Sequence, residues 1–277
     1  MTLVQSLPLA MFILVVELVV GSFVVLLLSD VEGEVSGGFL GVSALIFVGF
    51  ALFAAWIRAQ YPADAALAGY GVRLDWLGRE GRAFTFFLVF LGLYNPLTWF
   101  GWRAGRRAMG GLAAAAGVAT LVCGGLAYGQ APWAGLGTVV NFLAASLVLG
   151  GAMTGMLLGH WYLVSPKLSP RPLRHMTIVF FVALAVQLLS LPFYLGLVGF
   201  PAAAQQGADL LHKYGLILGV RVSMGLVFPI VLAVLAWHTT RIRAMRSATG
   251  LLYVGVGVVL AGEIVAKVLF FVGRLPV

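Results

Sequence analysis

The sequence predicts an all-α integral membrane protein with about eight transmembrane helices. Of its 277 residues, 62% are apolar and only 9% are charged, and the mean hydropathy is +1.06. This little polar surface cannot cover a globule in water, so we expect the lipid bilayer to surround the chain. The apolar runs are continuous rather than alternating, which favours helices over the strands of a barrel.

Eight segments are long enough to cross the hydrocarbon layer, which takes about 20 apolar residues. The predicted spans are 8–28, 38–57, 83–100, 110–128, 136–163, 174–199, 212–238 and 250–272. The longest connection, 58–82, mixes apolar and charged residues, and we interpret it as a short interfacial helix or a lid. An irregular connector is the alternative.

The basic residues predict the orientation of the chain. The net charge is +8, and nine basic residues follow the third, fifth and seventh spans: Arg103, Arg106, Arg107, Lys167, Arg171, Arg174, Arg241, Arg243 and Arg246. Basic loops face the cytoplasm, which predicts a multi-pass protein of the inner (plasma) membrane with both termini outside the cytoplasm. The inverted orientation is the alternative. Because the basic residues lie in short loops beside apolar spans, we expect no nucleic-acid partner.

The two halves of the chain resemble each other. The segment Gly21–Asp30 (GSFVVLLLSD) aligns with Gly151–His160 (GAMTGMLLGH), and Trp102–Met109 (WRAGRRAM) aligns with His238–Met245 (HTTRIRAM). The offsets between the aligned segments are 130 and 136. Aligned loops fall on the same side, so the repeats are parallel. The predicted domains are two four-helix bundles, the first at 1–128 with the 58–82 interfacial loop and the second at 129–277.

Histidine replaces other residues at aligned positions of the second half. His160 aligns with Asp30 and His238 with Trp102, and His175 is expected at the same end. Two histidines from different helices are the usual ligands of a haem b iron, and a histidine also donates hydrogen bonds to a quinone. We take His160 and His238 as the candidate pair, with His175 as a substitute. The alternative is that all three lie in the headgroup layer.

The residues next to His160 complete this hypothesis. Trp161 and Tyr162 would form the aromatic wall of a quinone or haem site. A Trp-Tyr pair is also typical of the aromatic belt at a membrane surface, which is the alternative interpretation.

Four ionisable residues fall inside predicted spans, where charge is costly. They are Glu17 in the first span, Arg221 in the seventh, and Glu263 and Lys267 in the eighth. Glu263 and Lys267 are four residues apart and so lie on one helix face. We predict that these two form a pair or share a polar cluster with Glu17 or Arg221. A proton path or a substrate contact is the functional interpretation, and ion pairing alone is the structural one.

We predict a membrane subunit of a respiratory or electron-transfer complex that exchanges electrons with quinone, with or without haem b. The loops are small, so other subunits of a membrane complex would carry any catalytic head. Eight spans in two four-helix bundles are similar, in span count and size, to the quinone-interacting membrane subunits of polysulfide- and nitrite-reductase-type complexes. No site residue follows from this similarity.

Two other functions remain open. The charges within the spans fit a small transporter or an ion or proton channel, and the small loops fit a structural membrane anchor without its own chemistry. Whether the chain is itself an enzyme stays undecided, because it has no nucleotide-binding, metal-binding or nucleophile motif that would place a catalytic residue.

Overall fold

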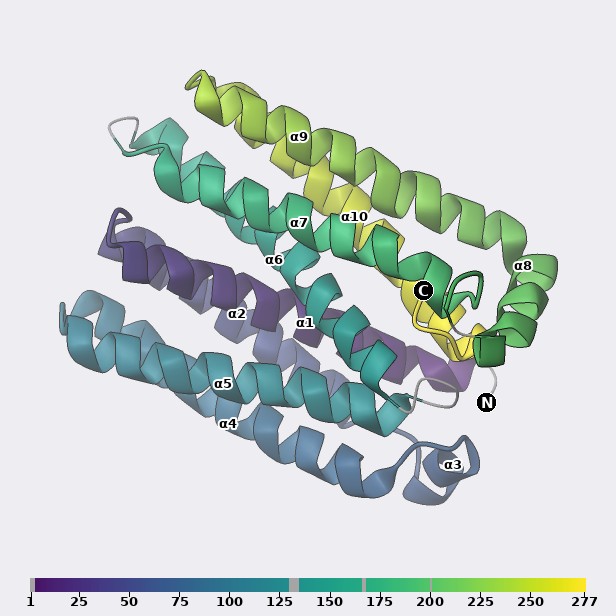
Figure 1. Ribbon diagram of the computed structural model, residues 1–277. Helices are drawn as coiled ribbons and strands as arrows, with labels where there is room; N and C mark the ends of the chain where they lie inside the picture. The colour runs from purple at the N-terminus through teal and green to yellow at the C-terminus, as the bar shows by residue number, and fades with distance from the viewer. Residues whose placement is uncertain (1–2, 130–134, 166–167, 200) are drawn as a thin grey trace.

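The computed structural model describes residues 3–129, 135–165, 168–199 and 201–277. These residues form helices joined by turns, without a β-strand among them, which confirms the predicted all-α class. Figure 1 shows the long helices lying side by side. Lys167, counted above among the basic loop residues, lies outside the described residues.

The helices follow the chain in two halves. The first half contains α1 (Leu3–Glu32), α2 (Gly37–Arg58), α3 (Asp64–Gly69), α4 (Leu74–Trp99) and α5 (Arg103–Tyr128). The second half contains α6 (Leu136–Val164), α7 (Arg171–Tyr194), α8 (Pro201–Val222), the π-helix η1 (Ser223–Val227), α9 (Phe228–Arg241) and α10 (Met245–Gly273).

Seven segments of the described chain are helical, long and apolar enough to cross a membrane. Six of the segments lie within single helices. The remaining one, Ala203–Arg241, runs through α8, η1 and α9. The structure therefore supports a multi-pass helical membrane protein. Helix α4 is 26 residues long but is not among the seven, since charged residues in its first turns and Asn95 and Pro96 near its end lower its hydropathy. The eighth span stays a prediction.

Several helix boundaries differ from the predicted ones. Helices α5 and α10 begin at Arg103 and Met245, so much of the predicted loops 101–109 and 239–249 is helical. Backbone hydrogen bonding continues beyond the apolar stretch, because a helix does not need apolar residues once it leaves the hydrocarbon layer. The predicted 58–82 loop contains α3 and the first turns of α4, and thus short helical segments.

The seventh predicted span, 212–238, is interrupted twice. Tyr214 has non-helical backbone angles (φ −130°, ψ 20°), and Figure 1 shows α8 bending there. Further along, η1 replaces one stretch of α-helix. The residues of α8 before Tyr214 form a helical segment that the sequence analysis left in a loop, because their polar residues hid the helix from a search for apolar runs.

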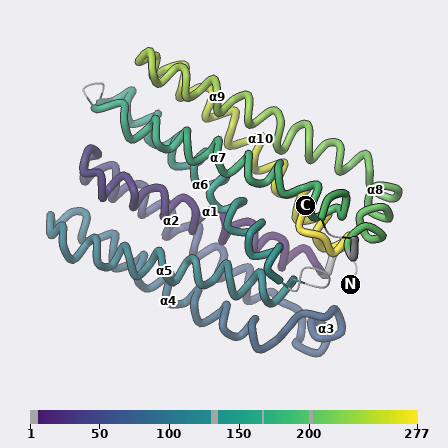
Figure 2. Tube along the Cα trace, viewed as in Figure 1, coloured from purple at the N-terminus to yellow at the C-terminus, as the bar shows by residue number. Residues whose placement is uncertain are grey.

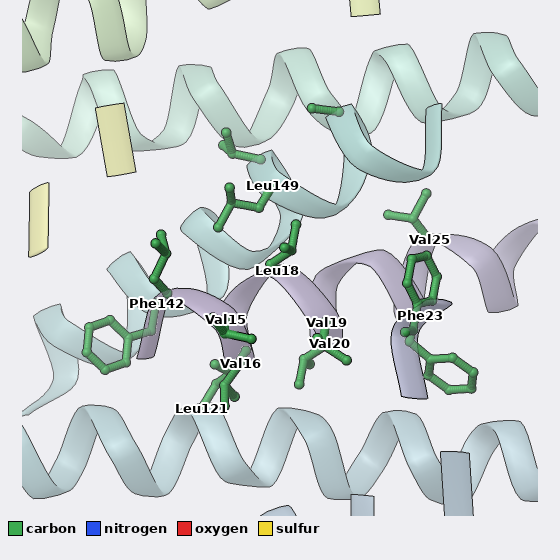
Figure 3. Close-up of a cluster of buried hydrophobic side chains, with 14 of the residues drawn as sticks. Val15, Val16, Leu18, Val19, Val20, Phe23, Val25, Leu121, Phe142 and Leu149 are labelled. Carbon is green, nitrogen blue, oxygen red and sulfur yellow. The ribbon is translucent and has the colours of Figure 1, made fainter. Parts of the chain in front are cut away.

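Helix α1 lies at the centre of the structure. It packs against α2 and α5 of its own half and against α6 and α10 of the other half. Figure 3 shows its apolar side chains between α5 on one side and α6 on the other. Helices α1 and α6 cross at backbone distance: a Cβ atom on Gly21 would lie 1.6 Å from the Ser146 carbonyl oxygen. Glycine permits this close crossing because it has no side chain.

The bundle has two ends (Figures 1 and 2), which we name after helix α3 and after His160, a residue near the end of α6. At the α3 end lie the start of α1, α3, the first part of α8 and the C-terminus. At the opposite end, the His160 end, lie the end of α1 and the turns that follow α4, α6 and α9. The basic segments after the third, fifth and seventh predicted spans therefore share one end of the molecule, as the sequence analysis expected.

Candidate functional site

Five polar side chains from four helices meet inside the bundle, and we call them the central cluster. They are Glu17 of α1, Gln187 of α7, Arg221 of α8, and Glu263 and Lys267 of α10. Each is at most 3% exposed. The four charged members are the intramembrane residues that the sequence analysis singled out, and Gln187 is an addition that its position within an apolar span could have suggested.

The members of the central cluster contact one another at short distances. Lys267 Nζ lies 2.7 Å from Glu17 Oε1 and 3.6 Å from Glu263 Oε2. On the other side of Glu263, Oε1 accepts hydrogen bonds from Arg221 Nη2 at 3.1 Å and from Gln187 Nε2 at 3.0 Å. Glu263 and Lys267 thus contact each other, and Glu17 and Arg221 both join the same polar cluster.

The two carboxylates of the central cluster differ in their partners. The side chain of Glu263 contacts two cations and one amide. Glu17 contacts Lys267, and apart from this ion contact neither of its oxygens accepts a hydrogen bond within the described parts of the chain. Neutralising Glu17 would consequently disrupt fewer interactions than neutralising Glu263.

The π-helix η1 positions Arg221. A π-helix shifts the backbone hydrogen bonds and is often found at functional sites. Here Arg221 Nη1 donates to the Gly225 carbonyl at 3.4 Å. A Cβ atom on Gly262 would lie 2.4 Å from the Gly225 Cα, so η1 and α10 pack backbone against backbone. This close packing brings Arg221 into contact with Glu263. No sequence pattern indicated the π-helix or the packing.

A second polar group, the Glu80 cluster, lies toward the α3 end, surrounds the buried Glu80 and was missed by the sequence analysis. Its members are Arg58, Tyr61, Glu80 and Tyr128. Glu80 Oε2 lies 2.6 Å from Arg58 Nη1 and accepts a hydrogen bond from the Tyr128 hydroxyl at 3.4 Å. The Tyr61 and Tyr128 hydroxyls are 3.1 Å apart.

The position of Glu80 in the sequence carried a signal that could have revealed its burial. Glu80 is 2% exposed and lies three residues after Leu77 and four before Phe84, both buried on the same face of α4. A carboxylate within such an apolar stripe is expected to have a buried partner. Tyr61 lies in the turn after α2, where desolvation raises the pKa of its hydroxyl well above the usual value, so Tyr61 is neutral.

A third polar group, the Asp30 cluster, lies at the His160 end and has the buried carboxylate of Asp30 at its centre. Its members are Asp30, Tyr94, Arg106 and Arg107. Arg106 binds the carboxylate of Asp30 through Nε, at 2.8 Å, and through Nη2, and the Tyr94 hydroxyl donates to the same carboxylate at 2.9 Å. Arg107 donates to the Asp30 carbonyl at 2.8 Å. This cluster ties α1 to α4 and α5, so Arg106 acts as a buried partner as well as a basic residue near a loop.

The candidate histidines lie at the His160 end, and all three are exposed. His160 Nδ1 lies 3.3 Å from the Tyr253 hydroxyl, and His175 Nδ1 lies 2.6 Å from Glu32 Oε1. Within the described residues, α6 and α9, which carry His160 and His238, are not in contact with each other. The described chain also holds no group of three or more His, Cys, Asp or Glu residues arranged to hold a metal ion.

The aromatic residues beside His160 pack within the protein. The Trp161 ring lies 5.9 Å from the Phe39 ring of α2, measured between centroids. The Tyr162 hydroxyl donates to the Ser169 carbonyl and so fastens the turn after α6. The assignment of these residues and of the histidines to a haem b or quinone site stays a prediction.

Comparison of the chain with protein-family models, with curated proteins and with solved structures found no match. The arrangement of the buried groups is therefore the basis for assigning a function. Of these groups, the central cluster combines cations with carboxylates, which can take up and release protons, inside the bundle.

Proposed function

We propose that this protein moves protons across the membrane through the central cluster. The observation that supports the proposal is the convergence of four ionisable side chains, at most 2% exposed, inside a bundle of membrane-spanning helices. Burying a charge costs several kcal/mol even when it is paired, and well-packed apolar side chains often fill the same volume at lower cost. A functional role explains why this bundle contains four charges.

In the proposed mechanism, Glu17 takes up and releases the proton. Protonation of Glu17 removes one of the two negative charges that hold Lys267, and the Lys267 ammonium then moves toward Glu263, which is 3.6 Å away. Release of the proton draws Lys267 back. Glu17 and Lys267 belong to α1 and α10, so this exchange changes the attraction between the two halves of the chain. A shift of this kind can couple proton uptake to a change between two conformations.

We also infer that the chain has eight spans in two repeat-related bundles, 1–128 and 129–277. Neighbouring helices support this inference. Each of α1, α2, α4 and α5 packs against the next in that order and α5 packs back on α1; α6, α7, α9 and α10 do the same. In this correspondence α4 matches α9, which favours α4 as the eighth span. The central cluster then lies where the two bundles meet.

Proton movement is tested with purified protein in vesicles that hold a pH-sensitive dye. A potassium gradient with valinomycin drives uptake, and we expect acidification faster than in protein-free vesicles. Glu17→Gln should reduce the rate to the protein-free level. The matched control is Asp64→Asn, which removes an exposed carboxylate from α3. A wild-type protein that conducts no protons in either direction of the gradient contradicts the proposal.

Quinone-linked electron transfer is a second candidate, and an apolar groove favours it. The groove has a volume of about 390 Å³, lies between α7 and α9, and is lined by Thr177, Ile178, Phe181, Val182, Ala233, Val234 and Trp237. It could hold an isoprenoid chain, since its lining is apolar and open to lipid. His238 follows Trp237 directly, which would place a hydrogen-bond donor beside the groove.

This candidate has its own test. A reduced-minus-oxidised visible spectrum of the purified protein detects haem b, and binding of a fluorescent quinone analogue detects the quinone site. We expect His238→Ala to weaken quinone binding. If the protein has no haem spectrum and His238→Ala binds the analogue as the wild type does, the electron-transfer function is contradicted.

The orientation also remains to be tested. With the basic segments in the cytoplasm, the α3 end and both termini face outside. Single cysteines at Ser169 and Gln205 should react with a membrane-impermeant reagent from opposite sides of the plasma membrane. Reaction from the same side contradicts the arrangement.

A further inference from the structure

The structure holds a small cavity beside Glu80. Its walls are Phe12, Ile13 and Val16 of α1, Glu80 of α4, Thr120, Leu121 and Gly124 of α5, and Phe142 of α6. The cavity has a volume of about 10 Å³. This is close to the space that one water molecule needs, and Glu80 supplies a polar wall.

The two carboxylate oxygens of Glu80 have different neighbours. Arg58 and Tyr128 both bind its Oε2 atom. The other oxygen, Oε1, lies on the side of Gly124, where an added Cβ atom would be 2.7 Å from it. Oε2 is thus held by Arg58 and Tyr128. The Glu80 carboxylate also forms part of the cavity wall.

Two of the residues that line the cavity adjoin members of the central cluster. Val16 immediately precedes Glu17 on α1. Phe142 lines the cavity, and its ring centroid lies 4.9 Å from Lys267 Nζ. Figure 3 shows Phe142 and Leu121 near Val15 and Val16 of α1. Glu80 thus lines the cavity directly, and the wall residues Val16 and Phe142 adjoin Glu17 and Lys267, respectively.

On the other side, hydrogen-bonded hydroxyls connect Glu80 with the protein surface. The Tyr128 hydroxyl lies 3.4 Å from Glu80 Oε2 and 3.1 Å from the Tyr61 hydroxyl. Tyr61 is partly exposed and lies in the turn between α2 and α3. Arg58 keeps its charge at all physiological pH values and so positions Glu80 rather than passing a proton.

We propose that Glu80 delivers protons from the α3 end to Glu17 through a water in this cavity. The Glu80 carboxylate accepts a proton from the Tyr128 hydroxyl, Tyr61 reprotonates Tyr128, and a hydronium ion at the surface reprotonates Tyr61 and becomes water. The protonated carboxyl of Glu80 then turns and gives its proton to the cavity water, which passes one of its own protons to Glu17. Every group between the surface and Glu17 gives one proton and receives one.

This inference rests on the proposed proton transport and is tested in the same vesicles. Glu80→Gln removes the relay group, and Tyr128→Phe removes the hydroxyl while leaving the ion pair of Arg58 with Glu80 in place. We expect each change to slow proton uptake about tenfold, equivalent to ~1.4 kcal/mol in the barrier. The matched control is Tyr194→Phe, which removes a buried hydroxyl that donates to the Gly137 carbonyl at 3.0 Å, outside the relay.

Chemical rescue separates a relay from a structural role. Glu80→Ala leaves a space beside Arg58 that formate, a small carboxylic acid, can occupy. Added formate should restore uptake by Glu80→Ala but not by Glu17→Gln. A structural loss would not respond to formate.

The outcomes distinguish this inference from the proposed function. If the wild type conducts no protons, proton transport itself is contradicted. If the wild type conducts, Glu17→Gln does not, and Tyr128→Phe conducts like the wild type while formate leaves Glu80→Ala unchanged, the relay through Glu80 is wrong and transport through Glu17 stands.

Discussion

The central cluster and the three histidines at the His160 end differ in their surroundings. The four charges of the central cluster are at most 2% exposed and contact each other across three helices. His160, His175 and His238 are exposed, and two of them have one polar partner each, Tyr253 and Glu32. Both sets contain residues capable of proton or metal chemistry, yet burial and convergence are found in the first set.

This difference teaches which part of the molecule depends on its polar contacts. A buried charge that loses its partner keeps its desolvation cost, whereas an exposed histidine that loses its partner is hydrated by water. Substitutions in the central cluster should therefore affect stability and function together. Substitutions of the histidines should affect stability little, so any effect they have on function can be attributed to chemistry.

The largest effect is expected for Lys267→Met. This change leaves Glu17 and Glu263 without the cation between them, and removing one partner of a buried ion pair typically costs about 3 to 5 kcal/mol. The free energy of unfolding in detergent micelles measures the loss. The double substitution Glu17→Gln with Lys267→Met removes both charges of the pair and should recover part of the stability. If the double variant is as unstable as the sum of the two single variants, the two residues are not coupled.

A smaller but substantial effect is expected for Asp30→Asn. Asp30 is 1% exposed and holds Arg106 through two hydrogen bonds. The substitution leaves Arg106 with a neutral partner, and we expect a loss of about 2 to 3 kcal/mol, below the cost of removing the partner entirely. In the sequence alignment of the two halves, His160 stands opposite Asp30. The loss of stability in Asp30→Asn is therefore compared with the loss in His160→Asn. Equal losses would contradict the contrast between a buried and an exposed site.

The contact between His175 and Glu32 should contribute little. His175 is 55% and Glu32 30% exposed at the side chain, so solvent screens their interaction. We expect His175→Gln to change the free energy of unfolding by less than about 1 kcal/mol. A larger loss, measured in the same micelles, would indicate that this pair fastens α7 to the end of α1.

The smallest effect on stability is expected for His160→Ala and His238→Ala. Both side chains are exposed, and such substitutions usually change stability by about 0.5 kcal/mol or less. These variants therefore test the predicted cofactor site cleanly. If either histidine binds haem b, its loss removes the low-spin haem spectrum; if both variants leave the spectrum, quinone binding and electron transfer by the assembled complex unchanged, the cofactor prediction is wrong.

Much of the polar interior could be predicted from individual residues. Glu17, Arg221, Glu263 and Lys267 were identifiable because each interrupts an apolar run, and charge in hydrocarbon requires a partner. Glu80 was missed because the polar residues around it made the start of α4 look like a loop. The π-helix beside Arg221 could not be foreseen either, since it follows from the backbone contact of Gly225 with Gly262 on another helix.

The sequence by itself determined the all-helical class, the apolar segments and the presence of charges that need partners, because these depend on composition and on local spacing. Tertiary structure alone decided that Lys267 lies between Glu17 and Glu263, that Glu80 of α4 and Val16 of α1 line one cavity, and that α6 and α9 stay apart. Residues 250 positions apart, such as Glu17 and Lys267, meet only after α1 has packed into the middle of the bundle. Distances of that kind depend on how helices cross, which is set by side-chain packing and by close glycine contacts rather than by the order of residues along one helix.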